Sequence, residues 1–548
     1  MLCQRYPRDP RHSCNRLVGS SPDNGSEGGE VLPPSPFSWK HSGTASQVRE
    51  VLDRAGYAEP TISELLETPE MPRPGQRRQA LPLYLWRSRG DTPLEAMVRL
   101  FLLHQPVSLQ AARRALAPMP LADWAECGLL AIGPTEVRAV VELAPYEGLV
   151  LAVDWAEAAV GDPVMGVAAT SRVLAQLTVR RHAPRALDLG AGCGIQALLA
   201  ARHSDHVSAT ELNPRAVHLA RFNAELNGLC HVAFLPGDWF GPVHGQLFDL
   251  IVCNPPFVIA PSQRRLHTHS SRPSDHLCRD LIQAAPPFLR QDGYFQLAAN
   301  WAHVTGQDWR DRLADWFAGI GCDAWVLHAD AEAAPTYALA RISEAGEDPD
   351  QATRLFDEWM AYYQREGIEG IGSGVITLRR STRRPNWVRF DRFPGVTGQG
   401  GAAIEQGFAL RDFLEANHSD RELLGARLCR ADHLCWAPRY EPTAAGWSVV
   451  ASQLRLTDGL AFLGNVDPPV AAFVARCNGE QPLGAALADI AVAEGQEAER
   501  LIPGFLRVVR RLVELGHLLP AKGEEKRPQT TVPSHGASAD RAGPIGLS

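Results

Sequence analysis

The chain has 548 residues, 45% of them hydrophobic and 21% charged, which describes a globular protein long enough for two to four domains. Its 54 basic residues against 62 acidic residues give a formal net charge of −8, which excludes a polycation that coats nucleic acid and confines any phosphate-binding surface to a local patch. No apolar run reaches the roughly 18 residues of a membrane span. The first 17 residues lack the apolar stretch of a secretion signal, and the 11 cysteines are scattered, so we expect a cytoplasmic protein with reduced thiols.

Both ends of the chain are poor in residues that form a core. Residues 1–45 are rich in Ser, Gly, Pro and Asn, and residues 523–548 have a similar composition, so we expect two disordered tails. Residues 46–150 open with helical patterns and end in two short apolar runs, 129–132 and 137–143. Helices followed by a small hairpin predict a winged-helix-like domain. Such domains often bind nucleic acid, but many only mediate contacts between proteins.

The middle of the chain has a different pattern. Residues 151–345 alternate short β-rich runs with helical stretches, which predicts an α/β domain with a parallel, Rossmann-like sheet flanked by helices. Residues 346–522 are less regular and read as an α+β domain whose last part is compatible with a second winged-helix-like module. We therefore expect three globular parts.

A glycine-rich turn follows the first buried strand of the α/β domain. Asp188-Leu189-Gly190-Ala191-Gly192-Cys193-Gly194 ends this strand and leads directly into a helix. Glycines permit a sharp turn and the close approach of a ligand, and the helix N-terminus attracts a carboxylate. Taken alone the spacing is also that of a dinucleotide-binding turn, so this motif leaves the cofactor open.

Two acidic residues after the next strands narrow that choice. Glu211 ends the second strand, where an acid can hold two ribose hydroxyls. Asp238 follows the third strand in Gly237-Asp238-Trp239-Phe240, where it can bond an adenine amino group. A simple turn is the alternative interpretation of Asp238.

The fourth strand leads into Asn254-Pro255-Pro256-Phe257. The two prolines exclude a helix and remove two N–H donors, which leaves a rim of acceptors formed by the Asn254 side-chain oxygen and the Pro255 carbonyl. Such a rim suits the two hydrogens of an NH2 group and turns the nitrogen lone pair toward an electrophilic methyl group. Phe257 offers a flat face for a planar acceptor. We therefore predict catalysis by positioning, without a strong base.

Together these motifs resemble motifs I to IV of class I S-adenosylmethionine-dependent methyltransferases. The resemblance is to the branch with the small-domain N-methyltransferase signature, which includes release-factor glutamine N5-methyltransferases and ribosomal or transfer RNA N-methyltransferases. It covers residues 160–300, about a quarter of the chain, and the layout as a whole is similar to long methyltransferases of high-GC Gram-positive bacteria. The resemblance implies S-adenosyl-L-methionine as cofactor and acceptor contacts from the tetrad Asn254, Pro255, Pro256 and Phe257. Cofactor contacts are implied at Asp188, Gly190, Gly192, Gly194, Glu211 and Asp238.

The acceptor is less constrained. Phe257 is commoner in the RNA-modifying members, where the glutamine-modifying members usually carry Tyr. Two basic stretches, one with Arg264 and Arg265 and one with Arg383 and Arg384 among aromatic residues, are candidate contacts to RNA. Arginines paired with acids in a linker are the alternative. We predict methylation of an RNA nucleobase, with protein glutamine methylation and a non-catalytic cofactor-binding regulator as alternatives.

Metal binding has weak support in the sequence. His267 and His269 could bind a metal, but no third ligand is evident. Cys429, His433 and Cys435 are a second candidate group, which we reject in the same way. We therefore predict no metal site.

Overall fold

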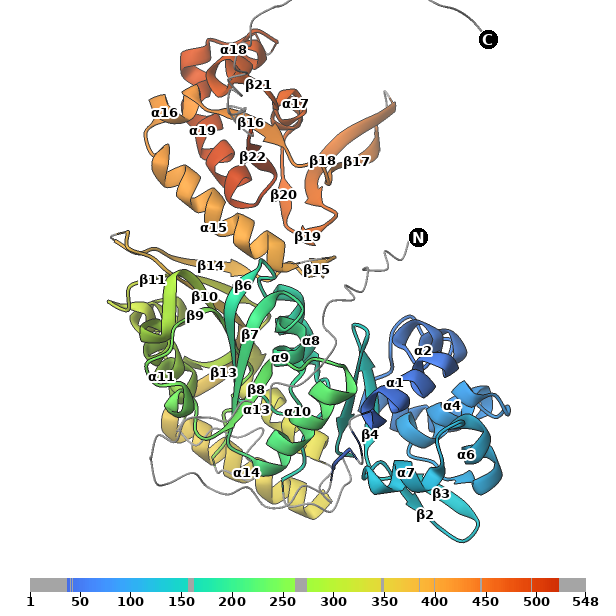
Figure 1. Ribbon diagram of the computed structural model, residues 1–548. Coiled ribbons are helices and arrows are strands. Elements are labelled where there is room, and N and C mark those ends of the chain that lie inside the picture. Colours follow the sequence, from blue (N-terminus) through green and yellow to red (C-terminus); the bar gives the residue numbers. More distant parts are fainter. Residues whose placement is uncertain are drawn as a thin grey trace, which may run out of the picture. The chain divides into compact units, whose positions relative to one another are not determined.

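The computed structural model describes residues 37–39, 41, 43–155, 162–261, 274–345, 349–383, 385–398, 400–443, 446–493 and 495–521. The chain divides into two compact units, residues 1–404 and 405–548 (Figure 1). The tail predicted at 523–548 lies outside the described residues, as does most of the tail predicted at 1–45. The end of that first tail is ordered, because Phe37 is buried and the ring of Trp39 stacks on Phe222 with centroids 3.9 Å apart.

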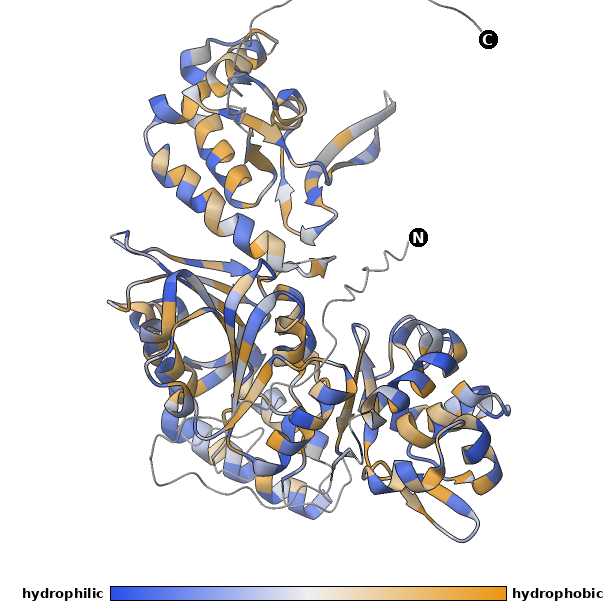
Figure 2. Cartoon of the chain, viewed as in Figure 1, coloured by the Kyte–Doolittle hydropathy of each residue, from blue (hydrophilic) through white to orange (hydrophobic). Residues whose placement is uncertain are grey.

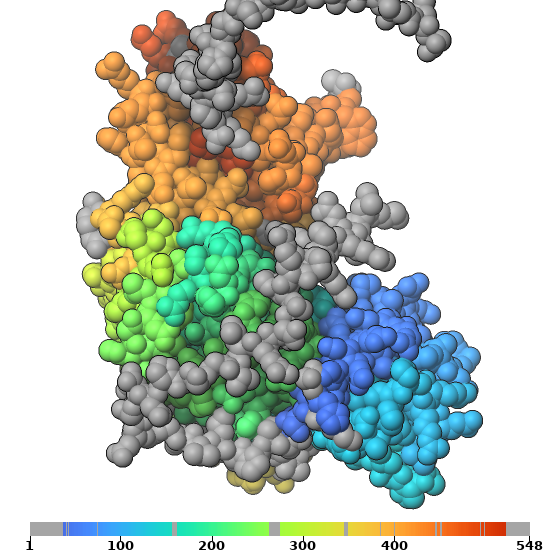
Figure 3. Space-filling view, viewed as in Figure 1, coloured from blue at the N-terminus to red at the C-terminus, as the bar shows by residue number. Residues whose placement is uncertain are grey.

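The N-terminal part of the first unit is a helical lobe (Figure 3, blue). Buried Trp124 and Phe101 stack at its centre. Its small sheet has the order β1-β3-β2, with two helices between β1 and β2, and its winged-helix-like character stays a prediction. The elements are α1 (Thr44–Ala55), α2 (Glu59–Leu65), α3 (Pro74–Gln79), α4 (Leu81–Arg87), α5 (Pro93–Met97), the π-helical turn η1 (Val98–Leu102), β1 (Val107–Ser108), α6 (Leu109–Ala115), α7 (Leu121–Glu126), β2 (Leu130–Ile132) and β3 (Glu136–Ala139).

A buried hairpin joins this lobe to the α/β part. Its strands are β4 (Glu142–Tyr146) and β5 (Leu149–Val153), and β5 is bound by two asparagines of α10 (Pro214–Leu226) and its C-cap. Asn223 accepts a bond from the Ala152 N–H at 2.7 Å and donates one to the Ala152 carbonyl at 3.0 Å. Asn227 bonds both backbone groups of Val150 in the same way. The hairpin is thereby fixed beside α10.

Nine strands of the described residues form the central sheet of the first unit. Its order is β14-β11-β13-β10-β9-β6-β7-β8, with β12 paired to β13, and β13 runs antiparallel to both neighbours. The strands are β6 (Ala183–Leu189), β7 (Ser204–Glu211), β8 (Val232–Pro236), β9 (Phe248–Cys253), β10 (Leu289–Val304), β11 (Cys322–His328), β12 (Glu332–Ala333), β13 (Ile368–Arg380) and β14 (Val388–Arg392). The chain moves outward from β6 through β8 and then returns to pair β9 with the other side of β6. This switch of direction creates a crevice at the carboxyl ends of β6 and β9.

Helices between the strands pack apolar faces onto the sheet, and each carries both hydrophobic and hydrophilic residues (Figure 2). One core joins buried side chains of β9 and β10 to α11 and η4 and includes Phe248, Phe295, Trp301 and Trp316. The remaining elements of this unit are α8 (Ala169–Leu177), α9 (Ile195–Ala200), η2 (Gly241–Val243), α11 (His276–Ala284), η3 (Pro286–Phe288), α12 (Trp309–Ala314), η4 (Asp315–Phe317), α13 (Ala334–Ala345), α14 (Pro349–Glu366) and β15 (Val396–Thr397).

The α/β part therefore extends further than the sequence analysis placed it. The predicted boundary at residue 345 falls at the end of α13, yet β13 lies in the middle of the sheet and β14 at its edge. The helical run 334–366 interrupts the β pattern before these last strands, which explains the early boundary. Described residues up to 404 belong to this unit.

The second unit is an α+β domain that begins within α15 (Gly400–Ala416). Its small sheet has the order β21-β16-β22, and a second sheet, β17-β18-β20, carries a long hairpin. Its apolar core includes Phe473, Val509 and Leu518. Its elements are α16 (Asp420–Gly425), β16 (Arg427–Arg430), β17 (Leu434–Thr443), β18 (Gly446–Leu456), β19 (Gly459–Leu460), β20 (Leu463–Asn465), α17 (Pro468–Arg476), β21 (Asn478–Pro482), α18 (Leu483–Ala493), α19 (Ala498–Glu514) and β22 (Leu518–Pro520). In the described parts of both units, no helix is long and apolar enough to cross a membrane.

Candidate active site

A cavity of about 550 Å³ lies at the carboxyl ends of β6, β7, β8 and β9. Its lining includes residues that the sequence analysis selected from four separate segments of the chain: Asp188, Gly190, Gly192, Glu211, Asp238, Asn254, Pro255, Pro256 and Phe257. Parallel strands bring their carboxyl ends to one edge of a sheet, so segments far apart in sequence meet here. Gly194 belongs to the same turn but is not among the lining residues.

Three glycines give the turn after β6 its shape, and each has a positive φ: 71° at Gly190, 55° at Gly192 and 88° at Gly194. A Cβ on Gly192 would meet no atom within 4 Å, so its backbone faces open space. A Cβ on Gly194 would lie 3.2 Å from the side chain of Ala220, so this glycine allows the turn to pack against α10. The turn thus presents bare backbone to the cavity while its far end is packed.

Two carboxylates, buried Asp188 and half-buried Glu211, hold this turn in place. Asp188 is 2% exposed and accepts a 2.8 Å bond from the Ala197 N–H in the first turn of α9. Burial raises its pKa to about 7, against the lowering effect of that bond and with a smaller raising effect from Glu211. Glu211 accepts 2.8 Å bonds from the N–H groups of Gly192 and Asn213, and burial raises its pKa. A cationic ligand would favour the ionised form of both groups.

The loop after β8 adds an acid and an aromatic ring. Asp238 is exposed at the cavity, and its carboxylate has no hydrogen-bond partner among the described residues. Trp239 has a positive φ of 42°, and its ring comes within 3.4 Å of the position of a Cβ on Gly190. Sequence reasoning did not select Trp239 as a site residue, although its place directly after Asp238 was a signal. Its indole gives the cavity a flat wall suited to a purine ring.

The tetrad after β9 has one oriented amide. The Asn254 side-chain NH2 donates a 3.0 Å bond to the hydroxyl of Ser171 in α8. Its side-chain oxygen is buried and has no hydrogen-bond partner among the described residues. An unpaired buried oxygen in a ligand cavity is a place for a donor from a ligand. Phe257 is partly buried and packs against the core that includes Phe248 and Trp316. Ser171 has no sequence signal, because it lies 83 residues before Asn254.

The helices α13 and α14 complete the cavity. Arg341, Ile342 and Glu344 of α13 line it together with Leu355 and Trp359 of α14. These helices follow β12 and precede β13, so they are an insertion between two strands of the sheet. Their sequence has a helical pattern without a functional motif, which is why none of these residues was selected.

The second arginine stretch does not belong to this cavity. In the register of the sheet, Arg379 of β13 lies opposite Tyr294 of β10, and Tyr294 lies opposite Leu250 of β9. Leu250 is three residues before the carboxyl end of β9 at Cys253. At about 3.3 Å per residue, Arg379 therefore lies about 10 Å behind that end, and Arg383 follows it beyond the end of β13. Arg383 therefore does not line the cavity and lies at the opposite edge of the sheet, and its contact with RNA stays a prediction.

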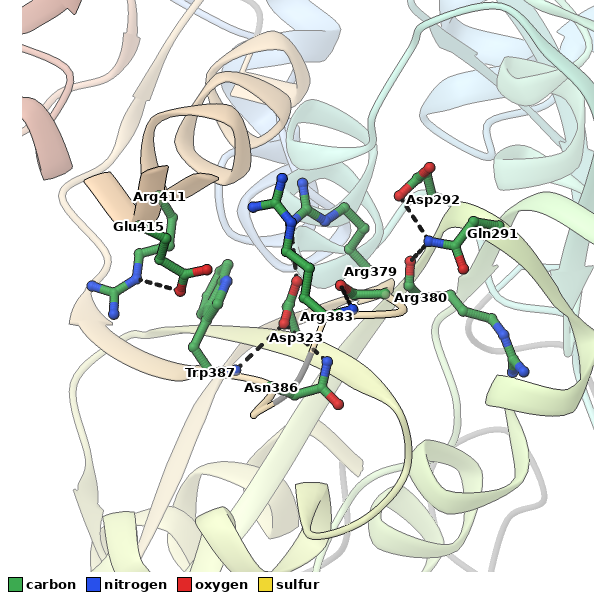
Figure 4. A network of polar contacts seen from close by, with 11 residues as sticks. Gln291, Asp292, Asp323, Arg379, Arg380, Arg383, Asn386, Trp387, Arg411 and Glu415 are labelled. Carbon is green, nitrogen blue, oxygen red and sulfur yellow. Dashed lines mark hydrogen bonds and ion pairs between the residues drawn. The ribbon is translucent and has the colours of Figure 1, made fainter. Parts of the chain in front are cut away.

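Arginines of this stretch take part instead in polar networks with acidic groups and backbone carbonyls (Figure 4). Arg379 forms a buried 2.9 Å ion pair with Asp323, which also accepts a 3.1 Å bond from Asn386. Arg389 pairs with Asp391, and Arg392 pairs with Asp330 at 2.7 Å. Arg264, Arg265 and Arg384 lie outside the described residues, as do His267 and His269. The described residues, Cys429, His433 and Cys435 included, contain no cluster of three metal-ligating side chains.

Comparison with known families gives matches to three segments of the chain. Residues 165–318 match the methyltransferase small domain. Residues 54–140 and 405–520 each match a domain of unknown function, DUF7059 and DUF7782 respectively. The methyltransferase match ends directly after η4, before α13 and α14, so these helices lie outside it.

Curated relatives match the same region. The release factor glutamine methyltransferase of Xylella fastidiosa (strain 9a5c) is 36% identical over 129 residues, which are 21% of this chain and 47% of that protein. The corresponding protein of Geobacter sulfurreducens is 33% identical over 142 residues, 23% of this chain and 50% of that protein. The ribosomal RNA small subunit methyltransferase C of Alcanivorax borkumensis is 32% identical over 116 residues, 21% of this chain and 32% of that protein. The chain thus spans half or less of the length of these relatives. The strand order, the cavity at the switch point and these matches together identify a class I S-adenosylmethionine-dependent methyltransferase domain in this chain.

Proposed function

We propose that this chain is an N-methyltransferase that methylates the amino nitrogen of a nucleobase in ribosomal or transfer RNA. The cofactor supplies a methyl group on a positively charged sulfur. Gly190 and Gly192 would admit it close to the backbone, Glu211 would hold its ribose and Asp238 its adenine amino group. The open backbone at Gly192, the unpaired carboxylate of Asp238 and the flat wall of Trp239 fit these parts of the molecule.

The unpaired side-chain oxygen of Asn254 carries the proposal. Ser171 holds the NH2 end of that amide at 3.0 Å, so the oxygen end is left for the cavity. We infer that this oxygen accepts one hydrogen of the acceptor NH2 group and that the Pro255 carbonyl accepts the other. Held in this way, the nitrogen directs its lone pair out of the plane of the acceptor. Positioning of this kind supplies up to about 7–11 kcal/mol in well-oriented reactions.

Proton removal needs no dedicated base in this scheme. The nitrogen becomes strongly acidic once it is methylated, so its proton can leave to water after attack. The two acceptors of the tetrad keep that proton in a hydrogen bond until then. This is consistent with a cavity in which the acids Asp188, Glu211 and Asp238 belong to the cofactor side.

Two observations favour a nucleobase as the acceptor. Phe257, which follows β9, and Trp359 of α14 both line the cavity, so two aromatic side chains contribute to its wall. One relative named above acts, by its name, on ribosomal RNA. The arginines 379–392 no longer support this choice, because they lie at the other edge of the sheet.

Protein glutamine is the second candidate acceptor. Several matching relatives are release factor glutamine methyltransferases by name, and a glutamine amide presents the same planar NH2 group to Asn254. The two acceptors differ in size and charge but not in the reacting atoms. The tetrad alone therefore serves both.

Transfer of a radiolabelled methyl group separates these acceptors. The purified full chain is incubated with labelled cofactor and with total RNA or total protein from a strain that lacks the gene. We expect label in RNA that nuclease releases and protease does not. Label that only protease releases would replace the nucleobase by the glutamine side chain. Absence of label in both fractions, with cofactor binding intact, would favour a non-catalytic regulator.

A further inference from the structure

The α13–α14 helical pair is attached to the chain segment that follows the tetrad. Val258 and Ile259 share an apolar cluster with buried residues of both helices. The Tyr363 hydroxyl of α14 donates a 2.8 Å bond to the Ile259 carbonyl. The Tyr337 hydroxyl of α13 accepts a 2.8 Å bond from the Asn300 side chain of β10. The inserted helices are therefore built into the acceptor side of the cavity and are not a loose appendage.

The charges that line the cavity are distributed unevenly. Asp162, Asp188, Glu211 and Asp238 come from the loops and strands around the glycine-rich turn. The helix α13 supplies Arg341 and Glu344, and Arg341 is the one cationic side chain among the described residues that line the cavity. A cofactor with a positive sulfur suits the acidic side. The arginine side suits a negatively charged group that arrives with the acceptor.

Arg341 is held in position, yet part of its donor capacity is unused. Its guanidinium carbon lies 5.4 Å from the centre of the Tyr337 ring, which restricts its position. One terminal nitrogen pairs with Glu344 at 3.0 Å, but Glu344 is 64% exposed and free to move into solvent. The Nε atom of Arg341 is buried and has no hydrogen-bond partner among the described residues. A buried guanidinium N–H without a partner costs free energy that a bound oxygen would recover.

We propose that Arg341 is a specificity-determining residue that binds a backbone phosphate next to the target nucleotide. This inference rests on the proposed nucleobase acceptor and names how the nucleic acid is held. The planar guanidinium offers two parallel N–H donors that match two phosphate oxygens. Glu344 binds the same guanidinium, so it competes with the phosphate and weakens phosphate binding. The base would then enter the cavity that Phe257 and Trp359 help to line.

Steady-state methylation of total RNA from the deletion strain tests this assignment. Arg341→Gln should raise KM for RNA about tenfold or more, because a hydrogen bond between charged groups is worth about 1.5–3 kcal/mol. It should leave kcat within about twofold and leave the calorimetric Kd of the cofactor unchanged. The slope of log KM against log salt should fall by about 0.7–0.9, the loss of one phosphate contact. Glu344→Gln should lower KM, which a merely structural role of the pair would not do.

Arg354→Gln is the matched control, because Arg354 is an exposed arginine of α14 that does not line the cavity. It should change neither KM nor the salt slope. Thermal melting of all three variants shows whether they fold. Folded Arg341→Gln protein with wild-type KM and salt slope on RNA would overturn the phosphate assignment and leave the proposed function intact. Label found only in protein would overturn both the phosphate assignment and the nucleobase acceptor. Absence of transfer by the wild type would overturn the proposed function itself.

Discussion

In the central sheet, β6 to β9 end at the carboxyl edge and begin at the amino edge. Polar side chains have different roles at these two edges. At the carboxyl edge the oxygen of Asn254 and the Nε atom of Arg341 are buried without a partner among the described residues. At the amino edge Asp323 receives bonds from Arg379 and Asn386 (Figure 4). The sequence marks both edges with polar and aromatic residues, and the amino edge carries more arginines. The polar groups of the carboxyl edge line a cavity, whereas the arginines of the amino edge are paired with acids of the fold, so charge by itself does not indicate a binding site.

Asn254→Ala removes the oxygen on which the carboxyl edge depends and should have the largest effect. We expect kcat to fall by about 10³-fold or more, because the acceptor nitrogen is no longer oriented. The calorimetric Kd of the cofactor should change little, since the residues proposed to hold it lie on other strands. Transfer of labelled methyl groups measures the first quantity. Turnover like that of the wild type would refute the assignment of the tetrad.

Asp323→Ala tests the amino edge, where we expect loss of stability and no specific loss of catalysis. The side chains of Arg379 and Asp323 are only 9% and 2% exposed, so removing the acid leaves a buried cation. Breaking such a pair typically costs about 3–5 kcal/mol of unfolding free energy. Denaturant unfolding of the full chain measures it. Activity per folded molecule, taken at a temperature where the variant is native, should match the wild type.

Ser171→Ala asks how much the orientation of the Asn254 amide contributes. The hydroxyl holds the NH2 end at 3.0 Å, and without it the amide is free to rotate by 180° about its last bond. We expect kcat to fall about 10-fold, with the KM of the cofactor unchanged. Ser171→Thr keeps a hydroxyl and should restore part of the rate. A wild-type rate for Ser171→Ala would mean that the cavity orients Asn254 by other contacts.

The raised pKa of Asp188 predicts a pH dependence of cofactor affinity. With a pKa of about 7 the carboxyl is mostly protonated at pH 6 and mostly ionised at pH 8. A cationic cofactor binds the ionised form better, so its Kd should fall by up to about tenfold over this range. Asp188→Asn keeps the acceptor for the Ala197 N–H and should lose this part of the pH dependence. Calorimetric titrations of both proteins at pH 6, 7 and 8 give the difference.

The same pKa also predicts the stability of the cofactor-free protein. Its folded pKa lies above the ordinary value of 3.8, so the folded state retains a proton that the unfolded state has lost. The free energy of unfolding should therefore fall as pH rises from about 4 to about 7. Asp188→Asn should remove this contribution and melt at a higher temperature than the wild type at pH 8. An equal melting temperature at pH 8 would contradict the burial argument.

The sequence predicted the parts of the site that are local to one strand end. Asp188, Glu211, Asp238 and Asn254 each close or follow a strand, and the topology of a parallel sheet brings strand ends together. Pairing across the fold was not predictable in this way. Ser171, Trp359 and Arg341 reach the cavity from helices whose patterns record only which face is buried.

The domain ends show the same limit of local patterns. Strands β13 and β14 complete the sheet, but α13 and α14 precede them. After this helical insertion, the sequence pattern does not show that the later strands belong to the same sheet. The arginine stretch was interpreted from its composition alone. Its ion-pair partner Asp323 lies 56 residues before Arg379, outside that stretch. Composition thus counts the charges of a segment but not the partners that the fold brings to it.

Arg383→Ala should have the smallest effect. Arg383 follows β13 at the amino edge, where its backbone N–H bonds the Ser381 hydroxyl at 3.2 Å. If RNA is held only at the carboxyl edge, this variant should keep KM, kcat and the salt slope within about twofold of the wild type. Arg341→Gln provides the contrast, because the same loss of one positive charge at the other edge should raise KM about tenfold. A raised KM and a reduced salt slope in Arg383→Ala would show that a long RNA acceptor spans both edges. The two edges would then contact different parts of the same RNA.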